Sequence, residues 1–520
     1  MTTVDPAGAS ANVEAPANIE APANIEAPAN ITAPAQDPRR WWVLALLSGL
    51  SFMILLDMTV VNVALPRIQD GLRFSDSGLT WVVNAYVLAA GGLLILGGRL
   101  ADVFGRRRLL LTGVVIFAVS SAVCGAAVSP AMMVAGRFGQ GVAEAIAAPA
   151  SLGLIALLFT DPKERTKALG IWSGLVALGG TSGYVISGLL TDLTSWRWIF
   201  FINLPVAAAV LLIMPRLVTE SRMVRAKNAG LDLPGAITLT AGLVAVVYGL
   251  LQAAEHSWGS ASVVIPLVAG ACLLAAMLVI ERRAKDPLIP LGFFANRTRT
   301  VVNATSLFFM AAFISYTFML TLFEQHVLDY SPMVSGLAWL PLSAAIGAGI
   351  GLGATLTPRL GVKAVTSAGF VGAGLGLLLT SMIDIDTSYA GGILPGMIVF
   401  GVFAGATMPA ATTAALHGVT VQDSSLASGV QNTMQQIGGA LGLALLVTLA
   451  LRYSGDEIQR GVDPQVAMTE GYVLALRTGA ALMVLGGLLI MVLFERVNPE
   501  LRDPTAEIVG ETRSTGVLRA

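Results

Sequence analysis

Charge is scarce in this sequence. Asp, Glu, Lys and Arg make up only 12% of its 520 residues, against ~25% in soluble domains, whereas 55% of the residues are hydrophobic. The mean hydropathy is +0.76. Water is not the main solvent of such a chain, and a membrane protein is indicated. The formal net charge of −1 provides no overall basic surface, so no nucleic-acid partner is expected.

Cysteine and histidine are also rare. Cys124 and Cys272 both lie in apolar runs, which excludes a disulfide framework and predicts small buried side chains. His256, His326 and His417 lie near loops and are widely separated. We therefore expect no metal, no cofactor and no enzyme activity. The chain also lacks a Gly-x-x-x-x-Gly-Lys-Ser/Thr loop, so ATP is not expected to drive it directly.

Residues 1–40 form a separate segment. Four near-identical hexapeptides, residues 11–16, 17–22, 23–28 and 29–34, each end in proline. A proline at every sixth position forbids a continuous helix, and the few apolar side chains cannot bury a core. We expect a flexible, weakly acidic tail. It lacks the basic-then-apolar order of a signal peptide and should stay attached.

Fourteen apolar runs follow the tail, each close to the ~20 residues that a spanning helix needs. They predict an all-α polytopic membrane protein whose main partner is the lipid bilayer. The runs are 41–65, 79–98, 109–128, 131–158, 168–190, 198–218, 233–252, 262–280, 301–323, 334–356, 364–382, 389–415, 425–451 and 471–494.

The distribution of basic residues predicts the orientation. With the amino terminus inside, the tails and inner loops hold 24 of the 31 Lys and Arg residues, and the outer loops hold five. Such a bias follows the positive-inside rule. We expect a multi-pass protein of the cell membrane with both termini in the cytoplasm.

An internal repeat predicts two halves. Glycines recur at eight-residue intervals after the second and the tenth run, at Gly97, Gly105 and Gly113 and at Gly353, Gly361 and Gly369. Paired six-helix halves would span 41–218 and 301–494, with two inserted spans and their loops at 219–300 and a tail at 495–520. Parallel repeats of this kind place the substrate path between the halves.

Seven segments carry a resemblance that covers nearly the whole chain after residue 40. They are 56–66, 98–108, 137–141, 195–205, 330–332, 336–341 and 428–439. They resemble the corresponding segments of one transporter family, the fourteen-span drug:proton antiporters of the major facilitator superfamily. The resemblance implies the major facilitator fold, a small organic substrate and protons as the coupled ion. We also expect a monomer.

Two positions depart from the family. In the fifth-span stretch 179–188, Tyr184 stands where the antiporters carry proline, so the resemblance supports transport more firmly than antiport. Gly179, Gly183 and Gly188 of the same stretch still allow close helix packing. Glu144 stands where the family usually has a small residue.

Charged residues inside spans predict the coupling site. Arg137, Gln140 and Glu144 fall at i, i+3 and i+7 of the fourth span, so they share one face. Asp57 lies within the first span. Ionisable groups in a membrane are costly and usually functional, so Asp57, Arg137 and Glu144 are expected to handle protons. The alternatives are a fixed Arg137–Glu144 network and a packing role for Asp57.

Further polar and aromatic residues predict a pocket for a bulky amphipathic compound. Glu324 would attract a cationic compound, although an ordinary interfacial acid near His326 and Asp329 is an equal alternative. The expected substrate-binding residues are Asn84, Tyr86, Gln140, Glu324, Gln325, Gln431, Asn432 and Gln435.

The loop after the second span predicts a gate. Gly98 and Gly105 would permit a tight turn, and Asp102 would pair with Arg99 or Arg106. The resemblance implies that Gly98, Asp102, Gly105 and Arg106 act in gating as the two halves rock.

Proton-coupled export of drugs or antibiotics by alternating access is therefore the expected function. A proton-linked porter for one metabolite, lipid or peptide is the alternative, because fold does not fix substrate. An intramembrane enzyme or a sensor is disfavoured.

Overall fold

The computed structural model describes residues 39–494 except 160, 219–231, 285–286, 288, 290, 418 and 420–423. The expected tails therefore lie almost entirely outside the described residues. Only Arg39 and Arg40 are placed, and they begin a helix instead of ending the tail. The described residues contain no strand.

Eight helices form the first half of the chain. They are α1 (Arg39–Leu72), α2 (Asp76–Leu79), α3 (Trp81–Phe104), α4 (Arg106–Gly125), α5 (Pro130–Leu158), α6 (Pro162–Leu193), α7 (Trp198–Phe201) and α8 (Asn203–Leu217). The next part holds α9 (Leu233–Glu255), α10 (Ala261–Arg283) and the short η2 (Leu291–Ala295). The second half holds α11 (Arg297–His326), α12 (Pro332–Ala338), α13 (Leu340–Leu360), α14 (Val362–Thr380), η3 (Tyr389–Ile393), α15 (Leu394–Ala415), α16 (Ser424–Gln459) and α17 (Pro464–Leu493).

These helices confirm the all-α membrane fold. Among the described residues, fourteen helical segments are long and apolar enough to cross a membrane, and each overlaps one predicted run. The predicted boundaries are short at several ends, since α1 continues to Leu72 and α16 to Gln459. Local signals start several helices: Ser129 caps α5 and Ser331 caps α12, each followed by proline in the first turn.

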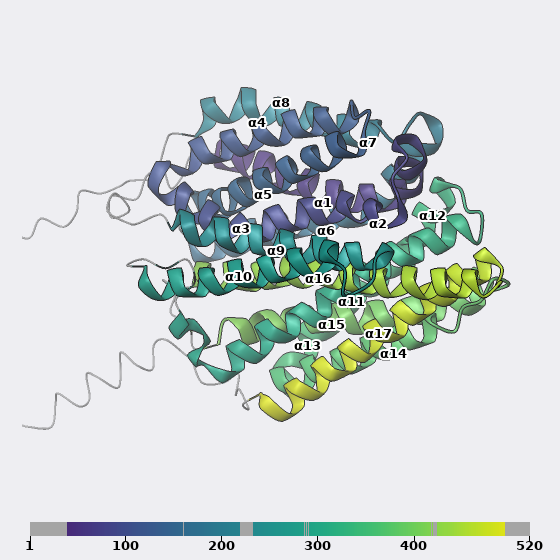
Figure 1. The fold of residues 1–520 in the computed structure, drawn as a ribbon. Helices are drawn as coiled ribbons and strands as arrows, with labels where there is room; N and C mark the ends of the chain where they lie inside the picture. Colours follow the sequence, from purple (N-terminus) through teal and green to yellow (C-terminus); the bar gives the residue numbers. More distant parts are fainter. Residues whose placement is uncertain are drawn as a thin grey trace, which may run out of the picture.

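The helices run roughly along one direction, with the first half above the second in Figure 1. Because successive spans alternate in direction, Arg39 and Leu493 lie at the same end of the bundle, here called the termini face. The opposite end, where α1 ends and α12 begins, is called the far face.

Equivalent glycines pack equivalent helices in the two halves. A Cβ on Gly97 of α3 would lie 1.9 Å from the backbone oxygen of Ala145 in α5. A Cβ on Gly353 of α13 would lie 2.3 Å from the backbone oxygen of Ala406 in α15. Helices α3 and α13 therefore press on α5 and α15 in the same way, as the glycine repeat predicts.

The turn after each of these helices is also repeated. Gly105 has φ 104° and Gly361 has φ 84°, values that a side chain disfavours. Each glycine ends one helix and directly precedes the next. Gly98 was expected to share in the first turn, and this is wrong, because it lies within the helical part of α3.

Helices α9 and α10 are inserted between the halves. Helix α9 packs on α3 of the first half and α16 of the second, whereas α10 packs chiefly on α9. At the far face, Arg452 of α16 donates to the backbone oxygen of Ala253 at 2.8 Å, and Ser77 donates to Glu255 Oε1 at 2.6 Å. The end of α9 is thus bonded to both halves. Cys272 of α10 is exposed, not buried as predicted.

The halves also meet closely where α6 packs on α12 at the far face. A Cβ on Gly188 would lie 2.6 Å from the backbone oxygen of Pro332, and one on Gly336 would lie 2.4 Å from that of Tyr184. Helix α13 continues from α12 toward the termini face, and α6 packs on α13 much less than on α12.

Candidate functional site

Arg137 and Asp57 form a buried ion pair inside the first half. Nη1 of Arg137, on α5, lies 2.6 Å from Oδ2 of Asp57, on α1. The side chains are 2% and 0% exposed. Either charge alone would be costly at this depth, so each depends on the other and on further hydrogen bonds.

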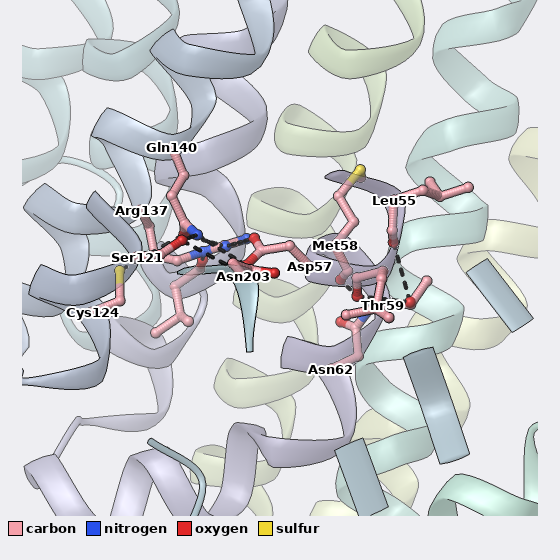
Figure 2. A network of polar contacts seen from close by, with 12 residues as sticks. Leu55, Asp57, Met58, Thr59, Asn62, Ser121, Cys124, Arg137, Gln140 and Asn203 are labelled. Atoms are coloured by element: carbon pink, nitrogen blue, oxygen red, sulfur yellow. Dashed lines mark hydrogen bonds and ion pairs between the residues drawn. The ribbon is translucent and has the colours of Figure 1, made fainter. Parts of the chain in front are cut away.

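Two amides complete the surroundings of Asp57, as Figure 2 shows. Nε2 of Gln140 and Nδ2 of Asn203 donate to Oδ1 of Asp57 at 2.9 and 2.7 Å. Both amides also donate to Oγ of Ser121, at 2.8 and 3.3 Å. We call Asp57, Ser121, Arg137, Gln140 and Asn203 the Asp57 cluster. Its members come from α1, α4, α5 and α8.

Arg137 also has partners other than Asp57. Its Nε donates to the backbone oxygen of Val82 at 2.8 Å, and its Nη1 donates to Oε1 of Gln140 at 2.7 Å. Its guanidinium carbon lies 4.4 Å from the ring centroid of Tyr86, a cation–π contact. The guanidinium would therefore stay partnered if Asp57 lost its charge.

Small residues of α5 bring the contributing helices together. A Cβ on Gly141 would lie 2.2 Å from the backbone oxygen of Tyr86 in α3. A Cβ on Gly136 would lie 2.5 Å from Sγ of Cys124 in α4. Larger residues at either position would push a neighbouring helix away. The sequence around Arg137 and Gln140 thus supplies both the polar groups and the close packing they need.

Glu144 lies one turn beyond Gln140 toward the termini face. It is partly buried, and its Oε2 has no hydrogen-bond partner among the described residues. The same holds for the hydroxyl of Tyr86. No ion pair joins Arg137 to Glu144 in the described part of the chain, because the carboxylate partner of Arg137 is Asp57. A fixed Arg137–Glu144 network, the alternative to a functional role, therefore contains no direct ion pair between these two residues among the described residues.

Sequence reasoning missed Asn203 and Ser121. Asn203 is the first residue of α8 and falls inside the family-like segment 195–205, so its place there was a usable signal. Ser121 is one serine among several in an apolar helix, and nothing in the sequence marks it.

Glu324 and Gln325 lie at the far-face end of α11. Glu324 is 0% exposed, and its Oε2 accepts a hydrogen bond from Oγ of Ser335 at 2.6 Å. The alternative of an ordinary interfacial acid is wrong, because such an acid would be in contact with water. Nε2 of Gln325 donates to the backbone oxygen of Val63 at 2.8 Å, which ties α11 to α1.

The other expected pocket residues lie on two helices. Asn84 of α3 is buried, and neither atom of its amide has a hydrogen-bond partner among the described residues. On α16, Gln431 is buried, Asn432 is exposed and Gln435 is partly buried. Helices α3 and α16 pack on each other, so these residues border one seam between the halves.

The expected gate residues contact the end of α5. Nη2 of Arg106 donates to Oδ1 of Asp102 at 3.0 Å, and the two residues form an ion pair. They are four positions apart and flank the turn at Gly105. Nη1 of Arg106 donates to the backbone oxygen of Gly153 at 2.8 Å. Of the two expected partners of Asp102, the structure shows Arg106.

Among all the residues that the structure describes, no group of three or more His, Cys, Asp or Glu is placed to hold a metal ion.

Curated relatives of this chain are antibiotic resistance and export proteins. A puromycin resistance protein of Streptomyces alboniger is 38% identical over 498 residues, which cover 93% of this chain and 95% of the relative. A lincomycin resistance protein of Streptomyces lincolnensis is 38% identical over 416 residues, covering 80% and 85%. A cephamycin export protein of Amycolatopsis lactamdurans is 36% identical over 400 residues, covering 76% and 82%.

Solved structures share the fold at low identity. A POT peptide transporter in complex with sulfate has a TM-score of 0.64 at 15% identity, covering 87% of this chain and 94% of that one. A bacterial homologue of the lysosomal transporter Spinster has a TM-score of 0.61 at 18% identity, covering 89% and 100%. The family described as Major Facilitator Superfamily matches residues 47–443. This chain belongs to the Major Facilitator Superfamily.

Proposed function

We propose that the protein exports an antibiotic or a related amphipathic organic compound from the cytoplasm in exchange for protons. The relatives described above support the substrate class, since their names state resistance to, or export of, antibiotics. The positive-inside bias supports an orientation in the cell membrane with the termini face in the cytoplasm. The role is transport and not catalysis, and one chain is the transport unit.

The observation that carries proton coupling is the buried Asp57–Arg137 pair. A proton that binds Asp57 neutralises it and abolishes the attraction to Arg137, so proton and guanidinium compete for one carboxylate. Arg137 can leave without losing all its partners, because the Val82 oxygen, Gln140 and the Tyr86 ring also hold it. The pair is therefore able to open and close as a unit.

Glu144 offers the guanidinium a second carboxylate. It lies on the same face of α5, closer to the termini face, and its Oε2 is unpartnered within the described chain. When Asp57 is protonated, movement of the Arg137 guanidinium toward Glu144 would keep the buried cation neutralised. Asp57 and Glu144 would then share one cation in time, which links protonation to a shift of α5.

Alternating access supplies the transport step. In this structure α6 packs closely on α12 at the far face but much less on α13, which continues toward the termini face. Such an arrangement suits entry of substrate from the cytoplasm. The Asp102–Arg106 pair, with its bond to Gly153, would break and re-form as the halves rock. Gln325, Gln431, Asn432 and Gln435 are proposed to contact substrate, and Asn84, Tyr86 and Gln140, which are 0% exposed here, are proposed to contact it only after the halves have moved apart.

Expression in a host that lacks its own exporters tests this function. With a panel of antibiotics, dyes and quaternary ammonium compounds, resistance should rise and cellular accumulation should fall, and a protonophore should abolish both effects. Resistance that persists with a protonophore would contradict proton coupling. Accumulation of a compound above the level of the empty host would instead indicate import.

A further inference from the structure

Glu324 is a fully buried acid that the Asp57 cluster does not use. It lies on α11 in the second half, and its side chain is 0% exposed. Oγ of Ser335, on α12, donates to its Oε2 at 2.6 Å. Its Oε1 has no hydrogen-bond partner in the part of the chain that the structure describes. The Ser335 hydroxyl is therefore the only hydrogen-bond partner of the Glu324 carboxylate among the described residues.

No positive charge compensates Glu324. Among the described residues, no Lys, Arg or His forms an ion pair with it. Four tyrosines lie near enough to interact with its charge: Tyr184 on α6, Tyr316 on α11, Tyr330 in the following loop and Tyr389 in η3. Asp57 has a guanidinium partner at contact distance, and Glu324 has none.

Aromatic rings surround this acid. Tyr184 stacks on Trp339 with ring centroids 5.4 Å apart, and Tyr316 meets the same indole edge-on at 5.9 Å. Glu324 is 0% exposed, so neither bulk solvent nor an organic compound reaches it in this state. A proton is the one cation that needs no additional space.

We propose that Glu324 is a second proton-binding site, which holds a proton while the far face is closed. Burying a carboxylate with neither a cation nor water beside it costs far more free energy than burying the neutral acid. The neutral acid carries no charge, and only one of its polar atoms lacks a hydrogen-bond partner here. The proposal deepens the proton-coupled function by naming a second site. It replaces the expectation that Glu324 binds a cationic substrate.

The contacts of α12 link this proton to the gate. Ser335 lies on α12, which also meets α6 through Gly336 and Gly188. Oδ2 of Asp192 on α6 accepts from the backbone N–H of Met333 at 2.9 Å, at the first turn of α12. Separation of α12 from α6 would therefore open the far face and admit water beside Glu324. The acid can then lose its proton to that water, and closing again requires that a proton return.

A thiol cross-link across the gate tests this. Asp192→Cys and Met333→Cys are combined with Cys272→Ser, because Cys272 is exposed and would react. The yield of cross-linking between the two cysteines by a short bifunctional thiol reagent then measures how much of the protein has a closed far face. The substitution also removes Asp192 as a titrating group. If closure binds one proton, the closed-to-open ratio falls by up to about tenfold per pH unit as pH rises.

Glu324→Gln is the decisive variant, because the amide keeps the size and can still accept from Ser335. We expect cross-linking to stay high across the pH series, and the infrared band of one protonated carboxyl group to disappear. Asp329→Asn removes an exposed acid at the same end of the bundle; it is the control and should keep the pH dependence. Neither readout requires transport, so the coupling role of Asp57 can fail while this site stands. An unchanged pH dependence in Glu324→Gln, or an unchanged infrared band, would overturn the proposal.

Discussion

Removing the charge of Asp57 is the sharpest test of the coupling site. Asp57→Asn preserves the size of the side chain, but it strands Arg137 as a buried cation. Loss of one partner from a buried ion pair costs about 3–5 kcal/mol. Arg137 keeps the Val82 oxygen, Gln140 and the Tyr86 ring, so we expect destabilisation near the lower end, about 3 kcal/mol.

Thermal unfolding in detergent and transport in vesicles measure the two consequences separately. Arg137→Gln should destabilise in the same way, because it strands Asp57. The double variant should be more stable than either single variant, since no charge is left unpaired. Gradient-driven export should be lost in Asp57→Asn even where the protein folds. Destabilisations that simply add in the double variant would refute the ion pair. Normal export at every pH in Asp57→Asn would refute its coupling role.

Three further outcomes follow from the same structure. Glu144→Gln should fold normally, because no ion pair depends on it, and its export should respond differently to pH; an unchanged pH profile would remove it from the mechanism. Gly97→Ala should lower the free energy of unfolding by about 1–3 kcal/mol, because the new Cβ would lie 1.9 Å from a backbone oxygen. Gly98→Ala is the control and should be tolerated, because its Cβ would lie 3.6 Å from the nearest atom. Reporter tags at residues 225 and 460 should lie inside and outside the cell, and labelling from one side alone would contradict the fourteen-span topology.

Span number and fold class could be predicted because they depend on local composition. A run of apolar residues long enough to cross a bilayer has to be helical, since backbone groups must pair within the segment. The ends were less predictable. Helix α1 continues to Leu72 past Pro66, because polar residues extend a helix beyond the apolar run wherever neighbouring helices support it.

Pairing within the site depended on information that sequence spacing does not contain. Residues 137 and 144 share a helix face about 10 Å apart along the axis, and this spacing alone does not say whether the Arg137 guanidinium turns toward Glu144 or toward another helix. The true partner, Asp57, lies 80 positions earlier and reaches Arg137 only because α1 and α5 pack together. The glycine repeat had the same limit. It predicted two equivalent turns, yet only the positive φ of Gly105 distinguishes it from Gly98.

The two buried acids, Asp57 and Glu324, differ in what must change around them before each can exchange a proton. In the first half, Asp57 is bound by the Arg137 guanidinium, so the proposed proton would have to displace that cation. In the second half, Glu324 has the Ser335 hydroxyl as its partner and no exposed surface, so the proposed proton would be exchanged only when water reaches the acid. One site would therefore respond to movement of a cation and the other to hydration of the gate. Tyr184 lies between the two sites. Its ring stacks on Trp339 of the second half and interacts with Glu324, and its helix α6 packs on α1, which carries Asp57. The position where related antiporters carry proline thus contacts both halves here, and the far face closes on that contact.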